Sequence, residues 1–331
     1  MTGRPPPRSS RRQSIRVFDE HPRSAAVGAA VGLSLTGILF ALSETSPSTA
    51  TVFRCLYALP ILWWLARRED AVHGPRPWRV RRWAVLAGLF FAADLLLFHH
   101  SILLMGAGLA TVLSNLQVVI VLFAAWIIWA ERPSLVQAAG IPVALVGILL
   151  ISGIVGGDAY GADPVLGSIL GVFVAITYAA YLLLMRKGRQ RDRAAGPILD
   201  STAAGLVGGL AAGIASGELQ AVPTLPGHVW LLLLALSAQV AGGLLLAVAL
   251  PRLPAATTSL ILLVQPVLAV AFAMIILAER PSATQFLGMA LVIGGVLLGS
   301  ARHAAPIGAA DTAADTAADP AATSSVHEAG T

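Results

Sequence analysis

Of the 331 residues in this chain, 56% are hydrophobic and only 12% are charged, and the mean hydropathy is +0.78. This composition excludes an ordinary water-soluble globular domain and indicates a protein built for lipid. The net charge is +5, but the Lys and Arg residues lie in short segments between apolar runs. That distribution excludes a nucleic-acid partner and points to a lipid bilayer.

Ten apolar stretches follow a polar N-terminal segment, and each approaches the length that a helix needs to cross a hydrocarbon core of about 30 Å. They are continuously apolar, which favours helices over the alternating strands of a barrel. The predicted spans are residues 24–43, 48–66, 82–104, 107–130, 134–152, 164–185, 197–216, 228–250, 254–278 and 282–300. The predicted fold class is an all-α polytopic membrane protein with ten transmembrane helices.

Both ends of the chain are polar and of low complexity. Residues 1–23 are rich in Pro, Ser and Arg, and residues 301–331 repeat a short Asp- and Ala-containing motif, so we expect two disordered cytoplasmic tails. The pair Arg11 and Arg12 resembles a twin-arginine export signal, but a basic tail that orients the first span is the favoured interpretation.

The basic residues predict the sidedness of the spans. If the N-terminus is cytoplasmic, 20 of the 22 Lys and Arg residues lie on the cytoplasmic side. The longest opposite loops, residues 153–163 and 217–227, contain none. This positive-inside pattern predicts that both termini are cytoplasmic. The strong preference for Arg over Lys is compatible with a GC-rich bacterial genome, and hence with a bacterial inner membrane.

The sequence contains a tandem duplication. The motif Ala-Glu-Arg-Pro-Ser occurs at Ala130–Ser134 and again at Ala278–Ser282. A shift of 148 residues aligns Leu116–Ser152 with Val264–Ser300 without a gap, with 16 of 37 positions identical. The duplication predicts two repeats, residues 24–152 and 164–300.

Each repeat holds five spans, and an odd number forces the second copy to enter the membrane from the opposite side. Inverted-topology repeats are typical of secondary transporters, in which two similar halves exchange conformations around a central site. The repeated Glu131 and Glu279 therefore lie at opposite membrane interfaces. A gating role is one interpretation of these glutamates, and helix capping or ion pairing with Arg132 or Arg280 is the favoured one.

Several local motifs are shared with a known family. The last span of each repeat has the spacing Gln137, Gly140, Gly147 or its copy Gln285, Gly288, Gly295; further matches are Phe53-Arg54, Gly106–Ala110 and Gln265-Pro266. Over residues 24–300 the chain resembles the EamA family of the drug/metabolite transporter superfamily. Where that family often has proline in span 4 this chain has Gln117-Val118, so we expect span 4 to lack a helix break.

The resemblance implies a bacterial inner-membrane carrier, often an exporter of amino acids or other small metabolites. Related carriers move drugs, nucleotide sugars or phosphorylated compounds, so an antiporter for one of these is an alternative. A membrane-embedded enzyme or a non-transporting signalling scaffold is the alternative from another class. No catalytic, cofactor or metal-binding motif is present in the sequence, and a homodimer is left open.

Ionisable residues within spans are the first candidates for a transport site, because each is expensive to place in lipid. Asp94 lies near the centre of span 3 and is a candidate proton-coupling carboxylate, or else a structural partner of Arg54. Arg54 could bind a substrate carboxylate, reach the interface, or pair with Glu44. His99 and His100 are further proton-coupling candidates, although a packed or interfacial histidine is the favoured interpretation.

Uncharged polar residues complete the candidate substrate site. They are Asn115 and Gln117 in span 4, Tyr178 in span 6, Gln239 in span 8 and Gln265 in span 9. Gln117 and Gln265 coincide in the duplication, so the two amides could meet near the midplane; hydrogen bonding between helices would explain them equally well.

Overall fold

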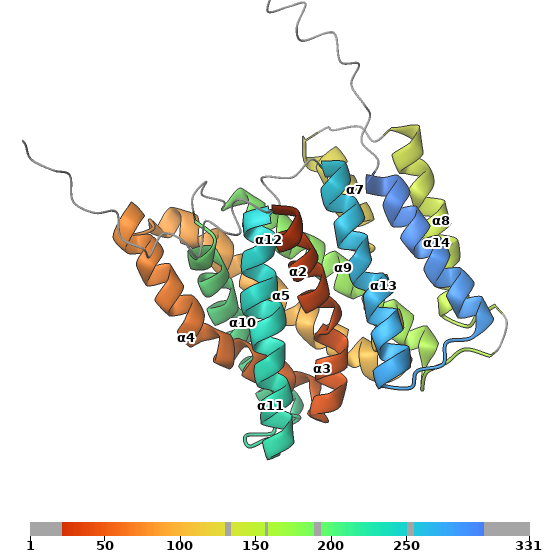
Figure 1. Ribbon diagram of the computed structural model, residues 1–331, viewed down its shortest axis with the longest axis horizontal. Coiled ribbons are helices and arrows are strands. Elements are labelled where there is room, and N and C mark those ends of the chain that lie inside the picture. Colours follow the sequence, from red (N-terminus) through yellow and green to blue (C-terminus); the bar gives the residue numbers. More distant parts are fainter. Residues whose placement is uncertain (1–21, 130–133, 156–157, 189–192, 250–254, 301–331) are drawn as a thin grey trace, which may run out of the picture. The chain divides into compact units, whose positions relative to one another are not determined.

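A computed structural model of the protein describes residues 22–129, 134–155, 158–188, 193–249 and 255–300, and within them the helices run side by side (Figure 1). The helices of the first repeat are α2 (Pro22–Ser34), α3 (Thr36–Ser43), α4 (Pro47–His73), α5 (Trp78–Met105), α6 (Ala107–Ser114), α7 (Gln117–Trp129) and α8 (Leu135–Ile151). Those of the second repeat are α9 (Pro164–Lys187), α10 (Ala195–Ser216), α11 (Leu225–Leu234), the π-helix η2 (Ala235–Gly242), α12 (Gly243–Ala249), α13 (Ala255–Ile276) and α14 (Ala283–Ser300).

Every predicted span is helical in the described residues. Helices α2 and α3 together form span 1, α6 and α7 form span 4, and α11, η2 and α12 form span 8. Among the residues that the structure describes, eight helices are long and apolar enough to cross a membrane, and α8 and the segment Leu263–Ile276 are shorter apolar helices. The fold is that of an all-α polytopic membrane protein whose described helices group into ten spans.

Span 4 departs from the expectation that it is unbroken. The helix is interrupted at Asn115 and Leu116, whose N–H groups bond the carbonyls three residues back, at 3.2 and 3.0 Å. The hydroxyl of Ser114 and the amide of Asn115 both donate to the Thr111 carbonyl, at 2.8 Å each. Local side-chain bonds of this kind compete with the helical ladder, so a break forms here without proline.

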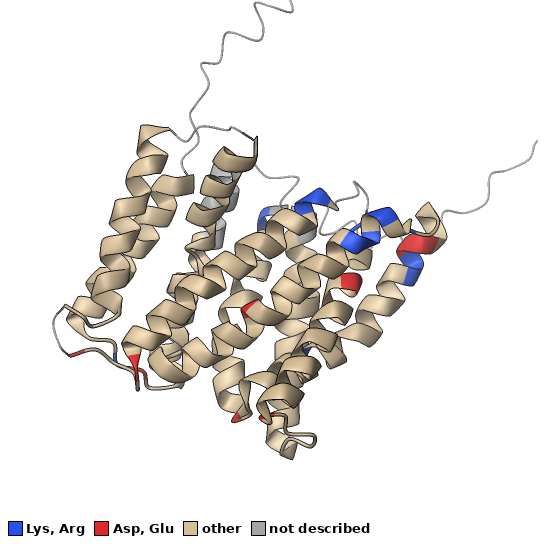
Figure 2. Ribbon diagram, turned by 180° about the vertical axis from the view of Figure 1, so that it is seen from behind, with Lys and Arg blue, Asp and Glu red and all other residues tan. Residues whose placement is uncertain are grey.

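The helices flanking the loop between spans 2 and 3 are longer than predicted. Helix α4 continues to His73 instead of ending at residue 66, and α5 begins at Trp78 instead of residue 82. The prediction followed hydropathy, which falls at Arg67–Asp70, whereas the helix continues past the apolar run and carries these charged residues with it. Figure 2 shows that Lys and Arg gather at this end of the helices.

Helices α8 and α14 lie side by side as an antiparallel pair (Figure 1) that shows the inverted symmetry of the repeats. A Cβ built on Gly147 would lie 2.7 Å from the Gly288 carbonyl oxygen, and one on Gly288 would lie 2.7 Å from that of Gly147. The same reciprocal approach joins Gly140 and Gly295, at 2.5 and 2.6 Å. The 148-residue offset exchanges these two contacts, so the glycines of the duplicated motif bring two backbones together.

This packing predicts a position-dependent effect of alanine on α14. Gly288→Ala places a methyl group against the backbone of α8, and overpacking of this kind lowers stability by about 1–3 kcal/mol. We expect thermal unfolding in detergent several degrees below that of the unchanged protein. Gly294→Ala on the same helix meets open space and serves as the matched control, with an unchanged or slightly raised midpoint. Equal midpoints for the two variants would contradict the packing.

Helices α4 and α10 form a second pair, held at both ends. At one end, the Glu69 carboxylate accepts hydrogen bonds from the N–H groups of Ala194, Ala195 and Gly196, at 2.9, 2.8 and 2.8 Å. At the other end, Ser46 donates to the Glu218 carbonyl at 2.6 Å. Ser46 and Ala194 are 148 residues apart, so the N-terminus of each helix is held by the C-terminal end of the other.

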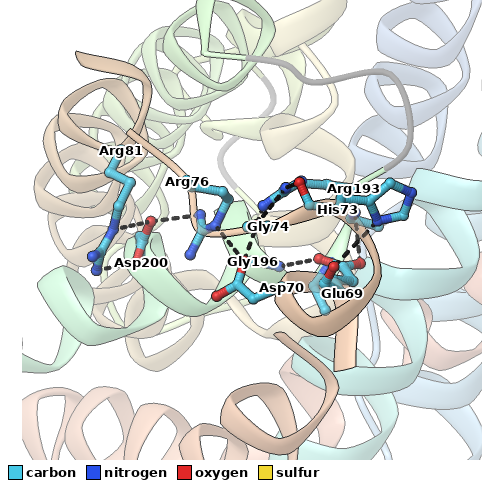
Figure 3. A network of polar contacts seen from close by, with 11 residues as sticks. Glu69, Asp70, His73, Gly74, Arg76, Arg81, Arg193, Gly196 and Asp200 are labelled. Atoms are coloured by element: carbon cyan, nitrogen blue, oxygen red, sulfur yellow. Dashed lines mark hydrogen bonds and ion pairs between the residues drawn. The ribbon is translucent and has the colours of Figure 1, made fainter. Parts of the chain in front are cut away.

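A polar network surrounds the end of this pair at which Glu69 lies (Figure 3). Asp200 lies between Arg76 and Arg81, with N–O distances of 2.6 and 2.9 Å, and Arg193 donates to Asp70 at 2.9 Å. The basic loop directly before α10 is the partner that chain order suggests for Asp200, yet its observed partners come from the α4–α5 loop and the start of α5. The extension of α4 beyond the apolar run explains the difference, because it carries this loop to the start of α10.

Removal of the Asp200 charge should destabilise the protein. Asp200→Asn leaves the buried Arg76 without its closest anion, and breaking a buried pair in this way costs about 3–5 kcal/mol. Because Arg81 is 44% exposed and can be solvated, we expect the lower end of that range. Thermal unfolding in detergent measures the effect, and Asp158→Asn at an exposed loop position is the control. A variant as stable as the control would show that the pair contributes little.

Candidate functional site

Arg54 is a buried cation that contacts other buried polar side chains. It lies about two turns from the start of α4 and is only 4% exposed. Its Nε donates to Oε1 of Gln239 at 3.3 Å, and the Gln239 amide nitrogen donates to the Thr202 hydroxyl at 2.7 Å. Nη1 of Arg54 is buried and has no hydrogen-bond partner among the described residues. A guanidinium N–H without a partner is a donor available to an anion.

Gln239 is presented by a π-helical segment. Residues Ala235–Gly242 form this wider turn in the middle of span 8. π-Helices are rare and occur frequently at functional sites. A Cβ on Gly32 of α2 would lie 2.7 Å from the Ser237 carbonyl oxygen, so α2 packs directly against the π-helix. The segment that positions Gln239 is thus supported by the first span.

Asp94 is the anionic member of the site. It is 6% exposed on α5 and lies three positions after Phe91, whose ring is next to the Arg54 guanidinium. Within the described residues, no hydrogen bond or ion pair shorter than 4 Å joins the two side chains. A carboxylate that is buried near a cation without being locked to it keeps the freedom to take up a proton or a second ligand.

Aromatic rings cover the same site. The guanidinium carbon of Arg54 lies 5.7 Å from the Phe91 ring centroid, and Phe91 lies 5.1 Å from Tyr181. Tyr181 in turn lies 5.4 Å from Tyr178. We refer to these side chains together as the Arg54 cluster, which consists of Arg54, Phe91, Asp94, Tyr178, Tyr181, Thr202 and Gln239.

Both repeats contribute to the Arg54 cluster. The first repeat supplies its two charges from α4 and α5, and the second supplies its neutral polar groups from α9, α10 and η2. The chemistry is that of a binding site for a small amphipathic anion: a cation with a free donor, amide and hydroxyl groups, and aromatic faces for an apolar body.

The histidines of α5 lie apart from these contacts. His99 is fully buried and stacked on Phe40 at 4.2 Å, with Nδ1 3.3 Å from both the Thr51 hydroxyl and the Pro47 carbonyl. His100 bonds the Leu96 carbonyl of its own helix at 2.7 Å, and its Nε2 lies 3.7 Å from Glu218. The structure therefore places His99 against spans 1 and 2, and His100 toward the α10–α11 connection.

The amides of spans 4 and 9 are also separate from the Arg54 cluster in the hydrogen bonds of the described residues. Asn115 bonds within its own helix, and Oε1 of Gln117 is buried without a partner there. Gln265 is half-buried on α13. Gln117 and Gln265 align in the duplication, but no hydrogen bond joins them in the described residues.

Sequence reasoning missed Phe91 and Thr202 of the Arg54 cluster, and it also missed the hydrogen-bonded pair Tyr57 and His228 on α4 and α11. Thr202 anchors Gln239, while the hydroxyl of Tyr57 and the ring of His228 are hydrogen-bonded to each other. Tyr57 follows Arg54 by three positions, which puts both on one face of α4 and was an available signal. His228 stands at the start of a predicted span, where a polar residue carries no signal.

The partner of Glu279 differs from those expected from the sequence, which were the helix end beside it and the adjacent arginine. Ser282 and Gln285 form the cap of α14: the Gln285 N–H donates to the Ser282 hydroxyl at 3.2 Å, and the Ser282 N–H donates to the side-chain Oε1 of Gln285 at 3.0 Å. The Glu279 carboxylate instead accepts from the N–H groups of Ala107 and Gly108 on α6, at 2.5 and 3.1 Å. Glu131 and Arg132 lie outside the described residues.

Comparison with known proteins agrees with this architecture. The model of the EamA-like transporter family matches residues 24–153 and again residues 165–301. A crystal structure described only as that of a protein matches with a TM-score of 0.55 and 16% sequence identity, over 84% of this chain and 96% of that chain, which establishes the fold alone. A search of curated proteins gave no match. Two copies of the family model on ten helices show that the chain belongs to the EamA-like transporter family and is a multi-pass membrane transporter of the drug/metabolite type.

Proposed function

We propose that this transporter is a secondary active carrier that exports a small metabolite with a carboxylate, such as an amino acid, by alternating access. The observation that carries the proposal is the Arg54 cluster, in which a buried guanidinium with an unpartnered Nη1 lies beside aromatic rings. Burial of a cation within a membrane span costs free energy unless an anion pairs with it during part of the transport cycle.

The shared construction of the cluster supports alternating access. Because Arg54 and Asp94 come from the first repeat and Tyr178 and Gln239 from the second, relative motion of the repeats changes the distances between them. A substrate bound to groups of both repeats would therefore lose or change contacts when the repeats move.

The proposed coupling ion is the proton, with Asp94 as the coupling residue. Protonation of Asp94 would leave Arg54 as the uncompensated charge and strengthen its attraction for a substrate carboxylate, whereas an ionised Asp94 competes for Arg54. Proton binding and substrate binding would then favour each other, which is the linkage of a symporter, so that a metabolite at high cytoplasmic concentration would leave the cell together with a proton.

The proposed location is a bacterial inner membrane with both termini in the cytoplasm. The basic residues at one end of the helices (Figure 2) support this orientation. Export is supported by the family resemblance alone.

Flux into proteoliposomes tests the proposal. We expect a labelled apolar amino acid to be transported, and its amide, which lacks the negative charge, to be transported at least about tenfold more slowly, because one charge-assisted hydrogen bond contributes about 1.5–3 kcal/mol. Equal rates for the acid and the amide would contradict a role for Arg54 in carboxylate binding. Flux only of nucleotide sugars or cationic drugs would favour the corresponding antiporter, and a catalytic activity without flux would favour a membrane enzyme.

A further inference from the structure

The contact between Glu279 and α6 joins the two repeats at the end of the helices opposite the basic network. Glu279 lies between α13 and α14 in the second repeat and is 4% exposed. Its two partners, the N–H groups of Ala107 and Gly108, form the first turn of α6 in the first repeat. These N–H groups have no carbonyl partner within their helix, so the carboxylate satisfies them and meets the positive end of the helix dipole.

The backbone on both sides is shaped for this contact. Gly106 has φ +94°, and a Cβ there would lie 2.8–2.9 Å from the Glu279 carboxylate atoms. On the other side, Ala278 adopts φ 55°, an unusual left-handed conformation for a residue with a side chain, and the Glu279 N–H bonds the Ala273 carbonyl at 3.2 Å. This closure of α13 directs the Glu279 side chain toward α6.

We propose that Glu279 is a positioning residue for transport, a latch that holds the outer ends of the two repeats together and must release before the site opens to that side. The inference rests on the proposed alternating-access function. A released carboxylate would be solvated, and the two N–H groups would bond water.

The chemistry of the latch is suited to release as well as to closure. Two charge-assisted hydrogen bonds favour the closed arrangement. Burial opposes it and raises the pKa of the Glu279 carboxyl, an effect that these hydrogen bonds only partly offset. The balance of the two leaves a contact that can open during a transport cycle.

Glu279→Gln is the informative substitution. An amide can accept from the Ala107 N–H, but its NH₂ group then faces the Gly108 N–H, and two donors cannot bond each other. The variant therefore keeps the size of the side chain and loses one of its two hydrogen bonds to α6.

Accessibility of a single cysteine measures the latch without any transport substrate. The chain has one cysteine, Cys55, so Cys55→Ala gives a cysteine-free background, and Ser114→Cys places a reporter at the inner end of α6. The rate of its reaction with a membrane-impermeant maleimide is measured in right-side-out vesicles. We expect Glu279→Gln to raise this rate about tenfold, as the loss of one charge-assisted hydrogen bond implies. Glu44→Gln, at an exposed glutamate, should change it less than about twofold.

A wild-type labelling rate in a folded Glu279→Gln protein would overturn the latch. If this variant does not give a monodisperse protein, Gly108→Ala replaces it, because its Cβ would lie 3.1 Å from the Val270 Cα and 3.2 Å from the Glu279 carboxylate, separating the same surfaces without removing a charge. An unchanged rate there would also overturn it. If no solute were transported, the proposed function would be contradicted. The labelling rates would still test the latch, because they are measured without a transport substrate.

Discussion

Asp94→Asn abolishes transport driven by a pH gradient, while exchange of substrate across the membrane continues. The substitution keeps the shape of the side chain and removes its ability to gain or lose a proton. Since Asp94 is buried beside Arg54 and is not locked to it by a hydrogen bond, a neutral amide there fixes the site in one charge state. Substrate can still bind Arg54, but its movement is no longer linked to a proton.

Proteoliposomes with an imposed pH gradient measure this effect. We expect gradient-driven accumulation to fall by at least about tenfold and counterflow without a gradient to change by less than about threefold, because only the proton-linked step is removed. Asp158→Asn, at an exposed loop position, is the matched control. Gradient-driven accumulation that survives in Asp94→Asn would remove Asp94 from the coupling mechanism.

Arg54→Lys raises the KM for a carboxylate substrate by about 10-fold to 100-fold, the effect of losing one charge-assisted hydrogen bond of about 1.5–3 kcal/mol. Lysine keeps the positive charge, so the Asp94 carboxylate retains a cation nearby. It loses the planar fork, and therefore the combination of a bond to Gln239 through Nε with a free donor at Nη1.

The comparison with an uncharged substrate isolates the role of Arg54. For the amide of the same amino acid, Arg54→Lys should have little effect on KM, because that ligand does not use the charged pair. Arg280→Lys, at an exposed position, serves as the control. If KM rises equally for acid and amide, Arg54 shapes the site without binding the carboxylate.

The α8–α14 pair shows where sequence reasoning and structure meet. The spacing of Gly140 and Gly147, repeated at Gly288 and Gly295, was visible as a motif, and small residues predict close helix packing. Sequence alone did not say which helices meet. The structure pairs each motif with the other in reverse order, as the inverted symmetry of the repeats requires.

Glu279 shows a larger difference. Its neighbours in the chain suggested a cap or an ion pair, yet its partners are more than 170 residues away in sequence, at 171 and 172 positions. The glycines of Gly106–Ala110 were recognisable as a family motif, but the structural reason for them is the Glu279 carboxylate, which occupies the space where their side chains would lie.

The sequence by itself determined the ten helices, the inverted duplication and the family, because lipid requires long apolar helices and a duplicated chain keeps its spacing. Only the tertiary structure decided which polar groups meet. The rotation and crossing of each helix follow from packing between distant segments, and these bring Arg54 to Gln239 and carry the Glu279 carboxylate to the first turn of α6.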